Sequence, residues 1–150
     1  MTFSAAAQAR FDLTGKTALI SGSSRGIGLA LASGLAEAGA HIILNSRDAG
    51  ALTAASEKIS AIGGTTSQLI FDVTDRQSAE DAINGFERDT GPIDILINNA
   101  GMQHREALDD FDLASFERVM ATNVTGVFTV SQLVARHMIA RKEGKIINIA

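Results

Sequence analysis

Short apolar runs alternate along this chain with longer segments in which apolar residues recur every three or four positions. Leu52, Ala55 and Ile59 have the spacing of one helical face, whereas Ile42-Ile43-Leu44 forms an unbroken run of the kind found in buried strands. The pattern predicts helices over about residues 27–38, 52–62, 75–86 and 115–141, the last bent near Asn123, and strands at 17–21, 41–44, 68–71, 94–97 and 145–149.

Strands that alternate with helices form parallel sheets that are covered by helices on both faces. We therefore expect an α/β fold, a doubly wound (Rossmann) parallel sheet with strand order 3-2-1-4-5, because right-handed crossovers leave few other topologies. No linker or change in composition divides residues 1–150, so a single domain is predicted. Such sheets bind ligands beyond the carboxyl ends of their strands, and site residues are expected there.

The composition narrows the classes of function. The chain has 150 residues, with 13 Lys and Arg against 17 Asp and Glu, so its formal net charge is 13 − 17 = −4. This charge argues against nucleic acid as the main partner, because Lys and Arg are not in excess and could not neutralise the phosphates. The absence of Cys excludes disulfides and thiol catalysis, and no metal site is predicted. With no membrane-spanning run and no signal peptide in residues 1–10, we expect a soluble cytoplasmic protein.

A cluster of glycines follows the first predicted strand and opens the first predicted helix. Its spacing is G-x-x-x-G-x-G, which differs from the general dinucleotide fingerprint. Glycines let the backbone approach a pyrophosphate, and a helix N-terminus offers free N–H groups to it. A tight turn would also use glycines, but the position in a β-α-β unit favours a dinucleotide-binding domain. The candidate cofactor-binding residues here are Gly22, Ser23, Ser24, Arg25, Gly26, Ile27 and Gly28.

Three motifs together resemble those of the short-chain dehydrogenase/reductase family. They are S-G-S-S-R-G-I-G at 21–28, where Ser21 replaces the usual Thr, N-N-A-G at 98–101, and N-V-T-G-V-F at 123–128. The resemblance covers residues 11–150. It implies an enzyme with a nicotinamide cofactor that interconverts a secondary alcohol and a ketone.

The same resemblance assigns roles to individual residues. It implies that Asn99, Ala100 and Gly101 lie against the cofactor, while Asn98 is structural. It also implies that Asn123 is catalytic, as one member of a proton relay with a Ser, a Tyr and a Lys. The alternative for Asn123 is a buried amide, satisfied by its neighbours, at a bend of the helix.

The residues after the second and third strands bear on the choice of nicotinamide cofactor. An NAD enzyme usually carries an acid about 20 residues beyond the glycine loop, but Ser46 and Arg47 stand there. A guanidinium can hold a 2′-phosphate, so the missing acid, and to a lesser extent Arg47 with Arg25, favours NADP over NAD. The alternative is that Arg47 is a solvated loop residue, and many family members carry Arg25 whatever their cofactor. The resemblance implies that Asp72 and Val73 contact the adenine; Asp72 is expected to be free to do so, because Asp75 or Thr74 can cap the next helix.

The chain lacks an evident proton donor for ketone reduction. It has no Tyr, and His104 is the one imidazole predicted near the carboxyl ends of the strands. In the family, the Ser and the Tyr-x-x-x-Lys pair follow a segment that resembles 145–150. We therefore expect residues 1–150 to be the amino-terminal part of a longer single-domain enzyme.

The residues after the fourth strand bear on the substrate. The run N-A-G-M-Q-H-R at 99–105 resembles sugar-acid reductases of the gluconate 5-dehydrogenase type, with Gln103, His104 and Arg105 suited to a sugar acid or polyol. The alternatives are a 3-oxoacyl-thioester reductase of the same family, a nucleotide-sensing Rossmann protein without turnover, and, for this loop alone, simple solvation. The family also implies a homotetramer, built through the long helix.

Overall fold

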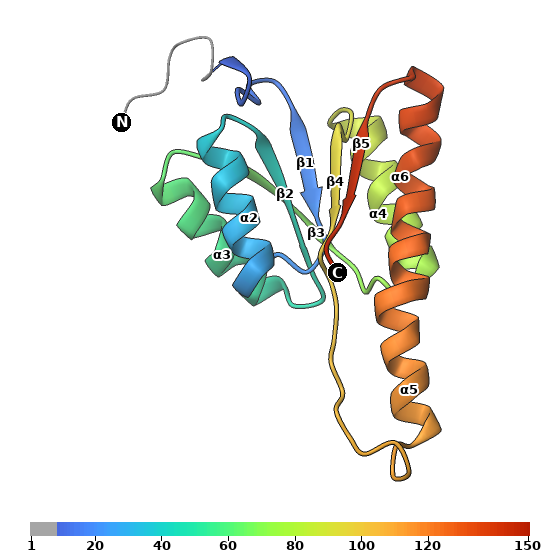
Figure 1. The fold of residues 1–150 in the computed structure, drawn as a ribbon. Coiled ribbons are helices and arrows are strands. Elements are labelled where there is room, and N and C mark those ends of the chain that lie inside the picture. The colour runs from blue at the N-terminus through green and yellow to red at the C-terminus, as the bar shows by residue number, and fades with distance from the viewer. Residues whose placement is uncertain (1–8) are drawn as a thin grey trace.

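The computed structural model describes residues 9–150, which form a five-stranded parallel sheet between two layers of helices (Figure 1). The strand order β3-β2-β1-β4-β5 confirms the predicted topology. The strands are β1 (Thr17–Ile20), β2 (His41–Ser46), β3 (Thr65–Ile70), β4 (Ile95–Asn98) and β5 (Lys145–Asn148). Within residues 9–150, no helix has the length and apolar character needed to cross a membrane. The prediction about a signal peptide falls mainly on residues 1–8, which lie outside the described residues.

Two apolar cores lie on opposite faces of the sheet because side chains alternate along each strand. Leu19 of β1 and Ile43 of β2 point into one core, whereas Ala18, Ile42 and Leu44 point into the other. The first core is closed by α4 (Arg76–Asp89) and α6 (Val127–Arg141), and the second by α2 (Gly26–Glu37) and α3 (Ala49–Ala61) (Figure 1).

Helix α2 packs on the sheet through small residues. Gly28, Ala32 and Ala36 are buried, at a spacing of four that places them on one helical face. In the sequence, Ile27, Leu31 and Leu35 recur every four residues, which predicts that they share the buried face of this helix. The prediction is wrong for Ile27, which is 66% exposed. A larger buried stripe would hold the helix farther from the sheet, so the smaller residues make the contact.

The predicted long helix is continuous but irregular. It consists of α5 (Leu113–Met120), a π-helical turn η1 (Ala121–Gly126) and α6. The π-helical turn includes Asn123, where the sequence predicts a bend, and such turns are frequent at functional sites. Helix α5 extends beyond the ends of the strands (Figure 1), so this part of the helix lies outside the core.

The strand boundaries differ from the predicted ones in β2 and β3. The two strands pair over six positions, from His41 with Thr65 to Ser46 with Ile70. As a result, β3 begins earlier than predicted, and Asn45 and Ser46 belong to β2. Pairing of backbone groups with the neighbouring strand decides these ends, and a single sequence does not contain that information.

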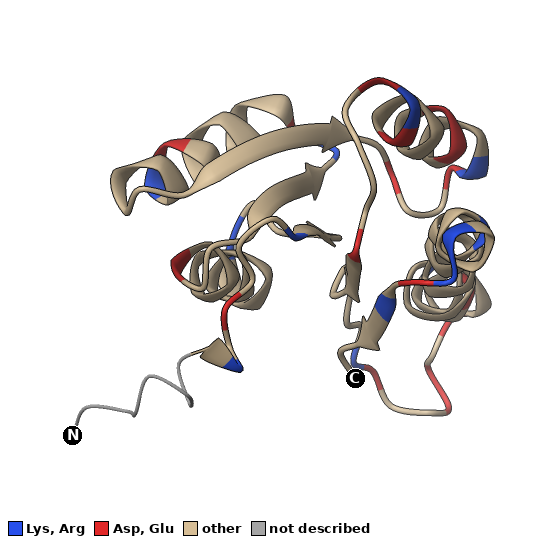
Figure 2. Ribbon diagram, turned by 90° about the horizontal axis from the view of Figure 1, so that it is seen from above, with Lys and Arg blue, Asp and Glu red and all other residues tan. Residues whose placement is uncertain are grey.

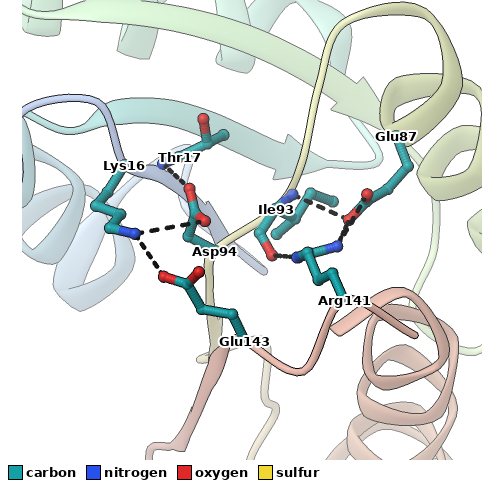
Figure 3. Close-up of polar contacts among 7 residues, drawn as sticks. All are labelled: Lys16, Thr17, Glu87, Ile93, Asp94, Arg141 and Glu143. Atoms are coloured by element: carbon teal, nitrogen blue, oxygen red, sulfur yellow. Dashed lines mark hydrogen bonds and ion pairs between the residues drawn. The ribbon is translucent and has the colours of Figure 1, made fainter. Parts of the chain in front are cut away.

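Within residues 9–150, every Lys, Arg, Asp and Glu except Lys145 of β5 lies on a helix or a loop (Figure 2). Several of them meet where the strands begin, which we call the amino edge of the sheet. There, Asp94 accepts a hydrogen bond from the backbone N–H of Thr17 at 2.9 Å, and Lys16 lies 2.7 Å from Glu143 and 3.9 Å from Asp94 (Figure 3). The Glu143 carboxylate raises the pKa of Lys16, and Lys16 in turn lowers the pKa of Glu143.

A second charged group at the amino edge joins α4 to α6. Glu87 accepts a hydrogen bond from the backbone N–H of Ile93 at 2.9 Å and pairs with Arg141 at 3.2 Å (Figure 3). Arg141 also donates to the carbonyl of Ile93. The Glu87 side chain is only 8% exposed, so the pair is largely screened from solvent.

Candidate functional site

A hollow of about 400 Å³ lies where strands β1, β2, β3 and β4 end, which we call the carboxyl edge of the sheet. Four segments predicted from the sequence meet there: the glycine loop, the end of β2, the chain after β3 and the N-N-A-G segment. The predicted residues that line the hollow are Gly22, Ser24, Arg25, Gly26, Ile27, Gly28, Ser46, Arg47, Asp72, Val73, Asn99, Ala100 and Gly101.

Ser23 is the predicted cofactor-binding residue that does not line the hollow. Its side chain is fully buried and its hydroxyl accepts a hydrogen bond from the backbone N–H of Asn45 at 2.9 Å. Its own N–H donates to the carbonyl of Asn45 at 2.9 Å. Ser23 therefore joins the glycine loop to β2, and its role in cofactor binding stays a prediction.

The N-terminus of α2 differs from those of the other helices that begin after a loop. Asp48, Asp75 and Asp112 each accept a hydrogen bond from a first-turn N–H of α3, α4 and α5, and Asp75 is thus confirmed as the cap of α4. Arg25 occupies the equivalent position of α2, and no side chain in residues 9–150 caps that helix. The first N–H groups of α2 therefore remain available, and together with the helix dipole they favour an anion.

Two glycines of the loop are required by close contacts. A Cβ at Gly28 would overlap the carbonyl oxygen of Gly22 and lie 2.5 Å from Nδ2 of Asn99. A Cβ at Gly22 would lie 2.9 Å from Cα of Ala100, and its φ of +63° also disfavours a side chain. The glycine loop thus packs against the N-N-A-G segment with no room for a methyl group.

Neutral side chains join the glycine loop to the end of β4. The hydroxyl of Ser21 accepts hydrogen bonds from the backbone N–H groups of Asn99 and Ala100, both at 3.0 Å. The amide of Asn99 donates to the carbonyls of Ser21 and Gly22 at 3.0 and 3.1 Å. The side-chain amide of Asn99 therefore donates to the glycine loop, and Asn99 also lines the hollow.

Asn98 has the structural environment that the resemblance implies. It is 2% exposed, and its amide donates to Ser131 of α6 at 2.7 Å and to Asn148 of β5 at 2.9 Å. It does not line the hollow.

Arg47 and Asp72 face each other across one end of the hollow. The side chain of Arg47 is 79% exposed, and its guanidinium lies 3.2 Å from the carboxylate of Asp72. Asp72 also accepts hydrogen bonds from the N–H and the hydroxyl of Thr74, at 2.9 and 2.7 Å. Partial burial opposes these interactions, but together with Arg47 they lower the pKa of Asp72. The expectation that Asp72 is free is therefore wrong, because a turn at the end of β3 engages its carboxylate.

Asn123 lies in η1 beside the hollow, and its side chain is exposed, so the alternative of a buried amide is wrong. Its side chain accepts a hydrogen bond from the N–H of Met102 at 2.9 Å and donates to the carbonyl of Met102 at 2.8 Å. A residue of the π-helical turn thus fixes the chain directly after N-N-A-G. Asn123 is exposed because this stretch of helix projects beyond the sheet.

Residues that line the hollow but were not predicted are Asn45, Phe71, Met102 and Thr122. Asn45 carries a visible signal, because it is a polar residue directly after an apolar strand run. The other three are recognised only once the segments are brought together.

The predicted substrate residues Gln103, His104 and Arg105 are exposed and lie outside the walls of the hollow. His104 lies 3.1 Å from Glu106 and packs against the ring of Phe111. His104, Glu106 and Asp112 hold possible ligand atoms within 4.8 Å of one another, all on exposed residues. This arrangement leaves the predictions about the substrate and about metal untested.

The walls of the hollow contain no Lys or His. Arg25 and Arg47 are their cations and Asp72 is their one acid. None of these is suited to exchange a proton with an alcohol near neutral pH. The described site can hold an anionic dinucleotide, but it provides no general acid of its own.

The sequence and this site together define the family. The model of the short chain dehydrogenase family matches residues 16–150, and the chain belongs to that family. A gluconate 5-dehydrogenase of Gluconobacter oxydans is 52% identical over 139 residues, which are 93% of this chain and 54% of that protein. A 5-keto-D-gluconate 5-reductase of Escherichia coli K12 is 45% identical over 139 residues, 93% of this chain and 55% of that protein.

A solved structure is similar as well. The gluconate 5-dehydrogenase of Burkholderia cenocepacia, in complex with NADP and tartrate, is 49% identical and superposes with a TM-score of 0.91. The match covers 96% of this chain and 56% of that one. The chain thus spans about half the length of the relatives that it matches.

Proposed function

We propose that this chain holds NADP in the carboxyl-edge hollow, as part of an oxidoreductase that interconverts a secondary alcohol and a ketone. The observation that carries the proposal is the uncapped N-terminus of α2, which opens onto a hollow whose walls contain two arginines and one acid. Three other helices are capped by aspartates, whereas α2 is the one helix that starts after a loop within residues 9–150 and has no side-chain cap. A bound anion would satisfy its first N–H groups.

In the proposed complex, each of four segments that line the hollow would contact a different part of NADP. The backbone from Ser24 to Gly28 would hold the diphosphate, and Ser46 with Arg47 would hold the 2′-phosphate. Asp72 and Val73 would border the adenine, while the segment from Asn99 to Gly101 borders the nicotinamide half. The bound cofactor would supply the hydride, and these residues bind and orient it.

The missing acid at Ser46 supports NADP over NAD. A carboxylate at the end of β2 would accept hydrogen bonds from the ribose hydroxyls of NAD and repel a 2′-phosphate. Ser46 has no charge, and Arg47 can donate several hydrogen bonds to a phosphate. The solved relative named as a complex with NADP supports the same choice.

We propose a sugar acid of the gluconate and 5-keto-gluconate type as the substrate, on the strength of the names of the two curated relatives. Gln103, His104 and Arg105 follow the segment that borders the nicotinamide half, and the guanidinium of Arg105 would attract a carboxylate. Asn123 is proposed as a member of the proton relay. It would act through groups outside residues 1–150, because the walls of the hollow hold no suitable acid.

The test uses the intact protein. We expect NADP to bind at least tenfold, about 1.4 kcal/mol, more tightly than NAD, and 5-keto-gluconate to be reduced faster than a 3-oxoacyl thioester or an aliphatic ketone. Equal affinity for the two cofactors would overturn the choice of NADP. Faster reduction of the thioester would favour the 3-oxoacyl reductase, and binding without turnover of any ketone would favour a nucleotide sensor.

We also propose that the protein self-associates, as a homotetramer, through the exposed side of the long helix. Five apolar residues recur there at helical spacing, with exposures between 39% for Met120 and 68% for Leu113. The five are Leu113, Phe116, Met120, Val124 and Phe128. Light scattering of the intact protein tests this proposal, and the mass of a monomer would contradict it. A cytoplasmic location belongs to the same proposal and is tested by cell fractionation.

A further inference from the structure

Asn45 is the one buried polar residue in the walls of the hollow, with 1% of its surface exposed. It lies near the end of β2, one residue before Ser46. The family motifs in the sequence do not include it. A buried polar side chain at a binding site is costly unless its hydrogen-bonding groups are satisfied, so its partners indicate what it is for.

The side chain of Asn45 connects three segments of the carboxyl edge. Its Oδ1 accepts a hydrogen bond from the N–H of Gly22 at 3.2 Å. Its Nδ2 donates to the carbonyl of Leu69 at 3.0 Å and to that of Phe71 at 3.2 Å. The amide therefore joins the first glycine of the loop to the end of β3.

Only an amide of this length satisfies all three partners. One acceptor and two donors are needed, and the carboxamide offers both on one short side chain. A carboxylate has the same shape, but it would place a negative oxygen against the carbonyls of Leu69 and Phe71. Alanine would leave Gly22, Leu69 and Phe71 without their bonds in a buried place.

Gly22 is held from both sides by asparagines of neighbouring strands. Asn45 of β2 binds its N–H, and Asn99, directly after β4, binds its carbonyl at 3.1 Å. The N–H of Gly22 is thus already used within the protein. The donors left for a diphosphate are the N–H groups that follow it, toward the start of α2.

We propose that Asn45 is a positioning residue of the phosphate-binding loop, which fixes Gly22 so that the N-terminus of α2 is aimed at the diphosphate of the bound cofactor. This inference rests on the proposed binding of NADP. Asn45 does not touch the diphosphate; it acts through the loop. Loss of the Asn45 side chain is expected to lower the affinity for ligands that carry a diphosphate and to leave the affinity for other ligands unchanged.

The experiment compares three ligands on the intact protein by titration calorimetry. NADP carries both the diphosphate and the 2′-phosphate, ADP carries only the diphosphate, and 2′-AMP carries only the 2′-phosphate. We expect Asn45→Ala to weaken NADP and ADP about tenfold and to change 2′-AMP less than about twofold. Asn45→Ser keeps a polar side chain without adding a charge, so it serves where the alanine variant does not fold, and the same split is expected for it.

Asn98→Ala is the matched control. Asn98 is also a buried asparagine at a strand end, but its amide binds Ser131 and Asn148 and lies away from the hollow. We expect this variant to bind all three ligands as the wild type does, even if it melts at a lower temperature. A split seen equally in Asn98→Ala would show that general loosening causes it, and would overturn the assignment.

The outcomes separate the two proposals. If the wild type binds none of the three ligands, the proposed function fails. If the wild type binds NADP and the Asn45 variants bind it equally well, only the positioning role fails. Equal weakening of NADP, ADP and 2′-AMP would likewise remove the role, because Asn45 would then support the whole edge rather than the loop.

Discussion

The two edges of the sheet are held together by different chemistry. At the amino edge, side chains of opposite charge pair with one another, as Lys16 does with Glu143 and Glu87 with Arg141. At the carboxyl edge, neutral hydroxyls and amides bind backbone groups. The neutral residues are Ser21, Ser23, Asn45 and Asn99.

The difference separates stability from binding. Ion pairs at the amino edge join the ends of helices and strands where no ligand is proposed to bind. Neutral partners at the carboxyl edge satisfy the buried backbone without placing a fixed charge beside a phosphate site. The positive field of Arg25, Arg47 and the N-terminus of α2 is therefore opposed within the walls of the hollow by Asp72 alone. Substitutions at the amino edge should therefore change stability and hardly affect cofactor binding, and substitutions at the carboxyl edge should do the reverse.

The largest effect is expected at the carboxyl edge, for Gly28→Ala. The new methyl group would collide with Gly22 and Asn99 and displace the loop. We expect NADP affinity to fall about 100-fold or more, ~3 kcal/mol. Gly34→Ala in the same helix is the control, because nothing lies within 4 Å of its Cβ. It should leave the affinity unchanged and raise the unfolding free energy by about 0.5–1 kcal/mol. Normal binding by Gly28→Ala would refute the packing argument.

Asn123→Ala is expected to have the next largest effect, on turnover. If Asn123 takes part in a proton relay, kcat should fall about 100-fold while the Kd for NADP changes little. The hydrogen bonds from Asn123 to Met102 offer a second explanation, in which the loss loosens the wall of the hollow and raises Kd as well. Measuring kcat and Kd on the same preparation separates the two, and an unchanged kcat removes the catalytic assignment.

Arg47→Ala is expected to reduce cofactor discrimination. Loss of the guanidinium should remove about 1.5–3 kcal/mol of the preference for NADP over NAD, the worth of hydrogen bonds to a charged group. NAD affinity should stay nearly the same, since the 2′-hydroxyl gains little from a cation. Titration of both cofactors measures this. Arg76→Ala, at an arginine bound to Gln132 away from the hollow, is the control and should alter neither affinity.

At the amino edge the opposite result is expected: Glu87→Ala should lower the unfolding free energy and leave NADP binding unchanged. The substitution removes a carboxylate that is only 8% exposed, so the N–H of Ile93 loses its acceptor and Arg141 loses its ion pair. We expect the unfolding free energy to fall by about 1–2 kcal/mol, with the Kd for NADP unchanged. Glu80→Ala breaks the more exposed pair with Arg136 and should cost less. A change in Kd for Glu87→Ala would show that the edges are coupled.

The smallest effect is expected for Glu143→Gln, and it depends on pH. Lys16 lowers the pKa of Glu143 below its usual 4.5, so the pair contributes stability above that pH and loses it as the pH falls through the lowered value. The difference in melting temperature between wild type and variant should therefore shrink in acid. Glu57→Gln, which removes a carboxylate with no ion pair among the described residues, should show no such trend. A constant difference across the pH range would contradict the assignment.

Much of the fold was predictable from the sequence, because local patterns carry it. Alternating apolar runs and helical stripes predict the β-α order, and right-handed crossovers then leave the observed strand order as the natural one. Ile27 shows the limit of such patterns. Its spacing matches an apolar stripe, but close packing on the sheet selected the small residues Gly28, Ala32 and Ala36 instead.

The candidate site was predicted where residues lie in contiguous motifs at strand ends, as at Gly22, Arg47 and Ala100. It was missed where a role depends on distant partners. Asn45 became recognisable only when β2, β3 and the glycine loop came together, and Ser23 proved to face β2. Phe71, Met102 and Thr122 were missed for the same reason.

The sequence by itself determined the β-α order, the glycine loop and the uncharged Ser46 beside Arg47, because each depends on neighbours along the chain. The tertiary structure alone decided which hydrogen-bonding groups remain available. It assigned Asp72 to Thr74 and Arg47, Asn123 to Met102, and the N–H of Gly22 to Asn45. Hydrogen bonds are short and directional, so their partners are set by atoms brought within about 3 Å by the fold, whatever their separation in sequence.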